Sequence, residues 1–239
     1  MKPVYKRIVL KLSGEVLDEK FSGDASKSMS DFLVEEISQV RDAGVEVSIV
    51  VGGGNILRGV QRNKAGVNDR VTADQMGMLA TVINALMLKD AFESANVTAV
   101  VMSAIDVGNI AEKYNKTDAV KHLSNGEIVI FGGGTSNPYF STDTAAALRA
   151  LEINADALVK GSKVDGVYDK DPMKYDDAKK LEELTYNEAL ENNLRVMDQT
   201  AFAILKESEI PIVVYHMTTP GMLMKVLSGE SGGSVVRNI

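Results

Sequence analysis

Short apolar runs alternate along the chain with longer stretches in which apolar and polar residues follow a helical period. Six runs rich in valine, isoleucine and leucine predict β-strands at residues 5–12, 45–51, 97–102, 127–131, 157–160 and 212–215. Several of them are continuously apolar, which is typical of strands covered by helices on both faces. This alternation favours an α/β fold, a three-layer αβα sandwich around a mostly parallel central sheet.

Helices are predicted from apolar spacing and from end signals. Residues 31–43 precede Gly44, which suits the left-handed position after a helix, and residues 144–151 form a second helix. Residues 72–95 carry more apolar positions than one stripe needs, which fits either a subunit interface or a buried helix. Thr185 and Glu188 match a capping box. Residues 18–30, 59–70 and 170–180 are polar loops of a length that often serves binding.

Composition narrows the class of protein. A chain of 239 residues with no recognisable linker predicts a single domain over residues 1–239. The formal net charge of −7 argues against binding to nucleic acid or an anionic membrane. The chain has no cysteine, which excludes disulfides and thiolate chemistry and fits a reducing compartment. No signal peptide and no apolar run approaching ~18 residues is found, so we expect a cytoplasmic protein.

Two glycine-rich segments follow predicted buried strands. One is Gly52-Gly53-Gly54 with Arg58 shortly after it, and the other begins at Gly132-Gly133-Gly134 and leads into a helix. Successive backbone N–H groups and a helix start bind anions, and arginine contacts phosphate through two donors. Two such loops suggest two phosphate-bearing ligands, or one ligand that spans both; the alternative is that they are flexible turns.

Two lysine-containing segments also follow predicted strands. Lys11 stands at the end of the first strand, where ligands of open α/β sheets bind, although a surface lysine before an ordinary turn is the simpler alternative. Near Lys160, the segment that follows contains Tyr168, which can stack on a planar base, and Asp171, which can accept from ribose hydroxyls. Each of these signals is weak by itself.

Several familiar sites are absent from the sequence. It has neither the P-loop pattern nor the protein-kinase signatures, and no G-x-G-x-x-G pattern follows a strand. Only two histidines occur, His122 and His216, so neither a histidine-rich metal site nor a Ser-His-Asp triad is supported. We predict no side chain as a metal ligand.

Taken in order, five segments resemble the bacterial-type UMP kinases of the amino-acid-kinase superfamily. They are K-L-S-G from Lys11, G-G-G-N-x-x-R-G from Gly52, D-Q-M-G-M-L-A-T from Asp74, G-T-S-N-P-Y-F-S-T-D from Gly134, and K-V-D-G-V-Y from Lys163 with a later D-P. The resemblance extends over nearly the whole chain. The segments that begin at Asp74 and Gly134 separate the UMP branch from kinases that act on carboxylates or carbamate. The resemblance implies an acceptor lobe at roughly residues 1–150 and an ATP lobe at roughly residues 151–239.

The resemblance also implies a role for each matching position. Lys11, Arg58 and Asp143 are the expected catalytic residues, with Asp143 orienting the lysine. The expected ATP-binding residues are Lys11, Leu12, Ser13, Gly14, Gly54, Arg58, Ser162, Tyr168 and Asp171. The expected UMP-binding residues are Gly53, Asp74, Thr135, Ser136, Asn137, Pro138, Tyr139, Phe140, Ser141 and Thr142. Simple helix capping is the alternative role for Ser141 and Thr142, and Lys160 and Lys163 are both candidates for a second phosphate-clamping lysine.

Further expectations concern cofactor, regulation and assembly. The resemblance implies phosphoryl transfer from Mg²⁺-bound ATP to UMP in pyrimidine nucleotide biosynthesis, activation by GTP, inhibition by UTP, and a homohexamer. The family's effector segment corresponds to Glu19, Lys20, Phe21, Ser22, Gly23 and Asp24, for which a mobile surface loop is the alternative. Two other functions are weighed: a different small-molecule kinase of the superfamily, and a non-catalytic nucleotide-binding protein on the same fold.

Overall fold

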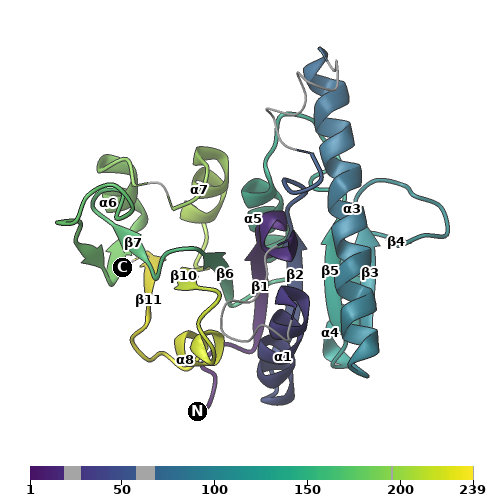
Figure 1. The fold of residues 1–239 in the computed structure, drawn as a ribbon, viewed down its shortest axis with the longest axis horizontal. Coiled ribbons are helices and arrows are strands. Elements are labelled where there is room, and N and C mark those ends of the chain that lie inside the picture. The colour runs from purple at the N-terminus through teal and green to yellow at the C-terminus, as the bar shows by residue number, and fades with distance from the viewer. Residues whose placement is uncertain (19–27, 58–67, 195, 239) are drawn as a thin grey trace.

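A single nine-stranded sheet organises the described residues, which are 1–18, 28–57, 68–194 and 196–238 of this computed structural model (Figure 1). From one edge to the other the strands are β4 (Glu112–Lys113), β3 (Ala99–Ser103), β5 (Ile128–Gly132), β2 (Glu46–Val51), β1 (Arg7–Leu12), β6 (Ala157–Ser162), β10 (Ile212–His216), β11 (Gly233–Arg237) and β9 (Glu183–Thr185). Neighbours pair in parallel except β10 with β11. A separate antiparallel pair joins β7 (Val167–Tyr168) to β8 (Lys180–Leu181).

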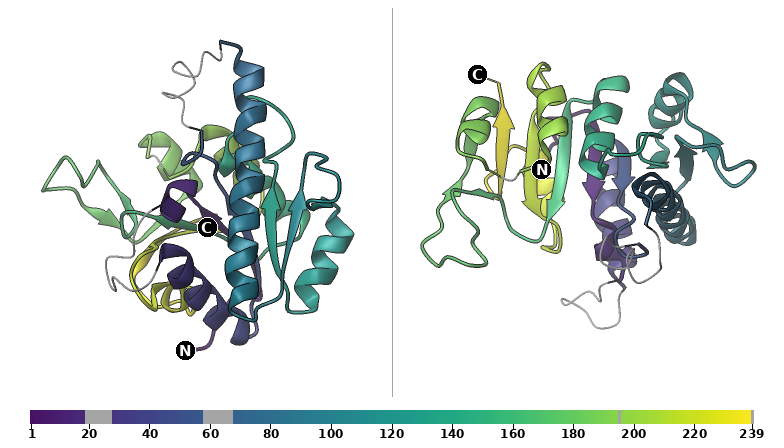
Figure 2. Two further views of the ribbon diagram at one scale, coloured as in Figure 1. Left: turned by 45° about the vertical axis from the view of Figure 1, so that its right-hand side comes forward. Right: turned by 90° about the horizontal axis from the view of Figure 1, so that it is seen from above.

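Helices cover both faces of the sheet (Figure 2). One face packs against α1 (Met29–Asp42), α3 (Arg70–Ser94) and α8 (Met222–Leu227), with the short 3₁₀ helix η1 (Gly14–Asp18) beside them. The other face packs against α4 (Lys116–Ser124), α5 (Thr142–Glu152), α6 (Tyr186–Glu191) and α7 (Gln199–Lys206). The three-layer αβα architecture expected from the sequence is confirmed.

The core explains why the central strands are apolar without interruption. Along β1, Ile8 and Leu10 pack into the core shared with α1 and α3, whereas Val9 packs into the core shared with α5 and α7. Successive side chains of a strand point to opposite faces, so a strand covered on both sides needs an apolar residue at every position. Because β1 pairs in parallel with both β2 and β6, the carboxyl ends of these strands lie at the same end of the sheet.

All six strands predicted from the sequence are present, each within two residues of its predicted ends. The helix predicted at 31–43 begins earlier, at Met29, because Ser28 and Asp31 form a reciprocal capping box. The sequence pattern does not predict strands β4, β7, β8, β9 and β11 or helices α4, α7 and α8. These elements have two to nine residues, which is too short for a periodic pattern to stand out.

Helix α3 is the longest helix of the described chain, and it is rich in apolar residues. By length and composition alone it could cross a membrane, although its apolar residues are interrupted by polar ones. Its Ala85, Leu88 and Phe92, however, are buried against the sheet, and it packs on β3 and β5. This packing is that of the core helix of a globular domain.

Candidate active site

The order of the strands creates a crevice at the carboxyl end of β1. The chain runs from β1 to β2 on one side and later adds β6 on the other side. In an open α/β sheet, this change of direction marks the place where ligands bind. Lys11 on β1 lies opposite Lys160 in the register of β6, so two lysines emerge side by side.

Asp143, in the first turn of α5, lies between these two lysines. Its carboxylate is 2.8 Å from Lys11 Nζ and 3.4 Å from Lys160 Nζ. All three side chains are at least four-fifths buried. Burial raises the pKa of Asp143, but the two lysines outweigh it and hold that pKa below its ordinary value. Burial also lowers the pKa of Lys160, an effect that Asp143 partly offsets.

The cluster distinguishes the two candidates for a second lysine. Lys160 pairs with Asp143 and also donates to the carbonyl of Val196. The side chain of Lys163 is instead 60% exposed, and its Nζ lies 3.8 Å from Glu15. The geometry therefore favours Lys160 as the partner of Lys11.

Asn84 of α3 fixes the first glycine loop. Its side chain is fully buried and donates to the carbonyl of Gly52 at 2.7 Å and to Oδ1 of Asn55 at 2.7 Å. Asn55 returns a hydrogen bond to Asn84 at 3.2 Å. A Cβ atom on Gly14 would lie 2.2 Å from the Gly52 carbonyl oxygen, so only glycine allows this approach of the two loops. Hydrogen bonds thus tie the first glycine loop to α3, and the loop after β1 packs directly against it.

Thr81 of α3 fixes the second glycine loop in a similar way. Its hydroxyl donates to the carbonyl of Met78 at 2.7 Å and accepts from the N–H of Gly133 at 2.8 Å. Gly133 has φ = 76°, a value that favours glycine. Both glycine loops are therefore anchored to the same helix.

A cavity of about 250 Å³ opens between the two glycine loops and α3. Seven of the predicted UMP-binding residues line it: Gly53, Asp74, Thr135, Asn137, Phe140, Ser141 and Thr142. Ser136, Pro138 and Tyr139 are not in its lining, and Gly54, predicted on the ATP side, is. Tyr139 has φ = 73°, which is strained for a bulky residue and is typical of functional loops.

Asp74 ties α3 to the segment that closes this cavity. One of its oxygens accepts from Arg70 at 2.7 Å and from the N–H of Tyr139 at 2.9 Å. Arg70 also lies 5.3 Å above the ring of Tyr139. The carboxylate thereby holds the 135–142 segment over the cavity while it lines the cavity itself.

A larger cavity, of about 520 Å³, lies beyond β6. Ser162, Tyr168 and Asp171 line it together with Lys160, as expected for one nucleotide site. The Tyr168 hydroxyl donates to Asp165 at 2.5 Å, which, with burial as a smaller contribution, raises the pKa of Tyr168. The predicted residues 11–14 do not line this cavity. Leu12 points into the core, so only its backbone can serve a ligand.

Seven predicted site residues lie outside the described residues. They are Arg58, predicted to be catalytic, and the expected effector segment, which consists of Glu19, Lys20, Phe21, Ser22, Gly23 and Asp24.

Sequence reasoning missed Asn84, Thr81 and Asp198, and a buried network at Arg149. Asn84 had a signal, since it is an amide within an otherwise apolar stretch of helix. Arg149 is 4% exposed, lies 3.7 Å above the Tyr114 ring, pairs with Glu152, and contacts the Gly134 carbonyl at 3.4 Å. No local sequence pattern predicts that network, because its residues come together only in the folded chain.

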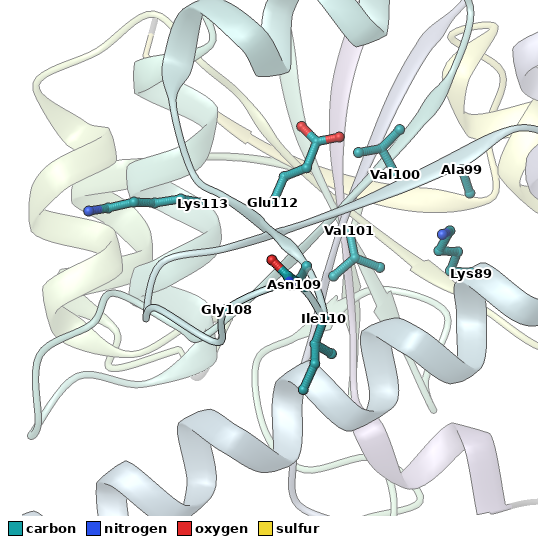
Figure 3. A pocket seen from close by; sticks show the side chains of 10 residues that line it. Lys89, Ala99, Val100, Val101, Gly108, Asn109, Ile110, Glu112 and Lys113 are labelled. Atoms are coloured by element: carbon teal, nitrogen blue, oxygen red, sulfur yellow. The ribbon is translucent and has the colours of Figure 1, made fainter.

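A third cavity, of about 460 Å³, lies at the edge of the sheet formed by β3 and β4 (Figure 3). Lys89 of α3, the start of β3 and residues 108–113 line it. None of the predicted site residues belongs to this lining. Within the described part of the chain, no group of three or more histidine, aspartate or glutamate side chains is placed to hold a metal.

Comparison with known proteins shows the family of this chain. Uridylate kinase of Psychrobacter sp. (strain PRwf-1) is 48% identical over 98% of this chain and 97% of its own length, and uridylate kinase of Wolinella succinogenes is 49% identical over 95% and 94%. The crystal structure of UMP kinase from Bacillus anthracis superposes with a TM-score of 0.91 at 40% identity, covering 98% of this chain and 96% of that one. UMP kinase from Ureaplasma parvum gives a TM-score of 0.89 at 36% identity over the full length of both chains. Residues 6–216 match the amino acid kinase family, to which this chain therefore belongs.

Proposed function

We propose that this chain is a UMP kinase that transfers the γ-phosphoryl group of ATP to UMP, giving ADP and UDP. One observation carries this proposal: the 135–142 segment and Asp74 line a cavity that lies beside the Lys11–Asp143–Lys160 cluster. Relatives of nearly equal length that are named for this activity support it.

The reaction needs alignment and charge neutralisation more than a covalent participant. The phosphate of UMP is itself an anionic nucleophile, so the site requires no general base. Lys11 and Lys160 stand at the strand ends with cationic groups that stabilise developing negative charge on the transferring group. Asp143 keeps both lysines in place. Arg58 keeps the catalytic role that its sequence position predicts.

Each nucleotide is assigned to one cavity. UMP occupies the cavity of about 250 Å³ in the acceptor lobe, at roughly residues 1–150. The adenine nucleoside of ATP occupies the cavity of about 520 Å³ in the lobe formed by roughly residues 151–239. There the ring of Tyr168 offers a stacking surface for the base. The phosphates of both nucleotides meet between these cavities, near Lys160.

Mg²⁺ enters with ATP in this proposal. The acidic side chain at the reacting centre, Asp143, is already paired with two lysines. Magnesium is commonly held by substrate phosphates and water with only one or two carboxylates. The residues present therefore fit an ion carried by the ATP phosphates, and the bound ion would neutralise charge on phosphate oxygens.

Assembly and regulation follow the family in this proposal. The protein would be a cytoplasmic homohexamer of pyrimidine nucleotide biosynthesis, activated by GTP and inhibited by UTP. Along α3, Leu79, Ile83 and Met87 form a stripe of exposed apolar side chains, each about half exposed. Their spacing of four residues places them on one side of the helix. A second copy of the chain, docked through the same stripe, would bury it symmetrically.

An acceptor panel tests the proposed reaction. The purified protein is mixed with Mg²⁺ and ATP and with UMP, dUMP, CMP, a glutamate derivative or carbamate, and ADP release is followed. We expect turnover with UMP to exceed that with every other acceptor. Turnover with a different acceptor and none with UMP would contradict the proposal. Tight nucleotide binding without turnover would instead indicate a non-catalytic protein.

A further inference from the structure

Asp198, the residue that caps the start of α7, makes contacts that a helix cap does not require. One of its oxygens accepts from the N–H of Ala201 at 2.9 Å, which is the capping bond. Its carboxylate also accepts from the hydroxyl of Thr144, at 3.0 and 3.2 Å, and from the hydroxyl of Ser141. The second set of bonds reaches across to α5.

These bonds fix the first turn of α5. The Ser141 hydroxyl donates its hydrogen to Asp198, while its oxygen accepts from the N–H groups of Asp143 at 3.0 Å and Thr144 at 3.2 Å. Thr144 is 3% exposed, so its hydroxyl depends on this protein acceptor. Asp143 lies between the two residues that Asp198 holds. The position of its carboxylate therefore depends on how that turn is fixed.

The loop before α7 also reaches the second lysine. Val196, two residues before Asp198, accepts from Lys160 Nζ through its carbonyl. Residues 196–198 thus contact both the turn that carries Asp143 and the lysine that pairs with Asp143. The negative charge of Asp198 favours the charged form of Lys160 as well, as a smaller contribution than burial.

We propose that Asp198 is a positioning residue for phosphoryl transfer. By accepting from Ser141 and Thr144, it holds the Asp143 carboxylate where that group can align Lys11 and Lys160. The proposal rests on the kinase function given above. Transfer between two bound nucleotides depends on alignment, and a displacement of about 1 Å can lower the rate 10²-fold.

The variant Asp198→Asn tests the proposal. Asparagine caps a helix about as well as aspartate, so α7 keeps its start. Its side-chain NH₂ replaces the oxygen that accepts from Ser141 and cannot accept, so Ser141 loses its acceptor and Thr144 keeps only the longer of its two contacts, at 3.2 Å. We expect kcat with UMP to fall about tenfold or more. The KM for ATP and the melting temperature are expected to stay close to those of the unsubstituted protein.

Asp31→Asn is the matched control. Asp31 also accepts from a serine hydroxyl and from a backbone N–H at a helix start, with Ser28 as the partner, but it lines neither nucleotide cavity. Its kcat should equal that of the unsubstituted protein. If Asp198→Asn also leaves kcat unchanged, the proposal is wrong. If Asp198→Asn lowers kcat only together with the melting temperature, Asp198 serves as a cap alone.

A double-mutant cycle tests the route through Thr144. Thr144→Val removes the hydroxyl and keeps the shape, and Thr144→Ser keeps the hydroxyl. We expect the valine variant to lower kcat, the serine variant to restore most of it, and the Asp198→Asn/Thr144→Val pair to lose much less than the product of the two single losses. Losses that simply multiply would overturn the coupling. The two proposals fail in different ways. Absence of UMP turnover in the unsubstituted protein would overturn the kinase function, whereas turnover that Asp198→Asn leaves unchanged would overturn only the role of Asp198.

Discussion

At the scale of single residues, the site concentrates positive charge in an acidic protein. The whole chain carries a formal net charge of −7, yet Lys11, Asp143 and Lys160 together leave one positive charge at the ends of β1 and β6. Because these groups are largely buried, water screens that charge little. Asp143 lowers the cost of burying two lysines together. The cluster is therefore suited to neutralising phosphate oxygens without attracting nucleic acid.

The two candidate lysines make different predictions. Lys160→Met removes a buried cation from the cluster and should lower kcat with UMP by on the order of 10²-fold. Lys163→Met changes a lysine whose side chain is 60% exposed and should alter kcat less than twofold, since Asp143 keeps both its partners. Steady-state kinetics of both variants checks this. A larger loss for Lys163→Met than for Lys160→Met would reverse the assignment.

Lys160 should also set the alkaline limit of activity. Burial lowers its pKa, so it loses its proton at a lower pH than an ordinary lysine. In the proposed mechanism the charged form of Lys160 is the active one, and kcat/KM reports the pKa values of the enzyme without bound substrate. We therefore expect kcat/KM to fall with rising pH, with a midpoint below the ordinary lysine pKa of about 10.4. Lys160→Arg stays charged throughout and should lose this alkaline fall, whatever its absolute rate. A fall that persists in the arginine variant would assign it to another group.

At the scale of elements, α3 organises the part of the site that we assign to UMP. Asn84 anchors the first glycine loop, Thr81 anchors the second, and Asp74 anchors the segment that closes the cavity. These three residues lie along a single helix of 25 residues. A helix is stiffer than a loop, so one rigid element sets the separation of the two glycine loops.

The first glycine loop packs so closely on α3 that a single added methyl group at Gly53 should disturb it. In Gly53→Ala, the new Cβ would lie 2.8 Å from both Ala80 Cβ and the Gly77 carbonyl oxygen, so the loop must move away from the helix. We expect a loss of about 1–3 kcal/mol in unfolding free energy and a higher KM for UMP. Gly54→Ala is the control for stability, because its Cβ would lie 4.0 Å from its nearest neighbour. Equal melting temperatures for the two variants would contradict this packing.

At the scale of the whole molecule, one strongly apolar helix serves two purposes. Its buried side packs on the sheet, while Leu79, Ile83 and Met87 remain about half exposed on the other side. The net charge of −7 makes copies of the chain repel one another. An exposed apolar patch on such a protein often marks a specific interaction site. We propose that copies of the chain assemble through this stripe, which would explain why α3 is apolar on its exposed side as well as on its buried side.

Ile83→Lys tests that assembly. A symmetric contact would place the lysine in the interface twice, and each lost apolar side chain is worth ~1.5–3 kcal/mol when fully buried. We expect sedimentation to show a smaller species than the unsubstituted protein forms. Leu190→Lys, on α6 and 39% exposed, is the control and should leave the assembly unchanged. If the Ile83→Lys variant forms the same oligomer as the unsubstituted protein, the stripe is not an interface.

Much of the site was predictable because its residues follow strands directly. Once a strand ends, the next few residues must lie at that edge of the sheet, so Lys11, Gly53 and Ser162 could be placed from their neighbours in sequence. Asp198 could not. It lies in an unpredicted stretch before a helix of eight residues, and its importance comes from hydroxyls 54 and 57 positions away. No local sequence pattern can predict a contact between residues so far apart in the chain.

The sequence by itself determined the sheet strands, the glycine loops and, through resemblance, the reaction class. The strands and glycine loops could be determined in this way because apolar period and glycine preference are local consequences of backbone geometry. Tertiary structure alone decided that Lys160 rather than Lys163 faces Asp143, that α3 anchors both loops, and that Asp198 reaches α5. These relations depend on strand order and on helix packing, which bring together residues that the chain itself keeps far apart.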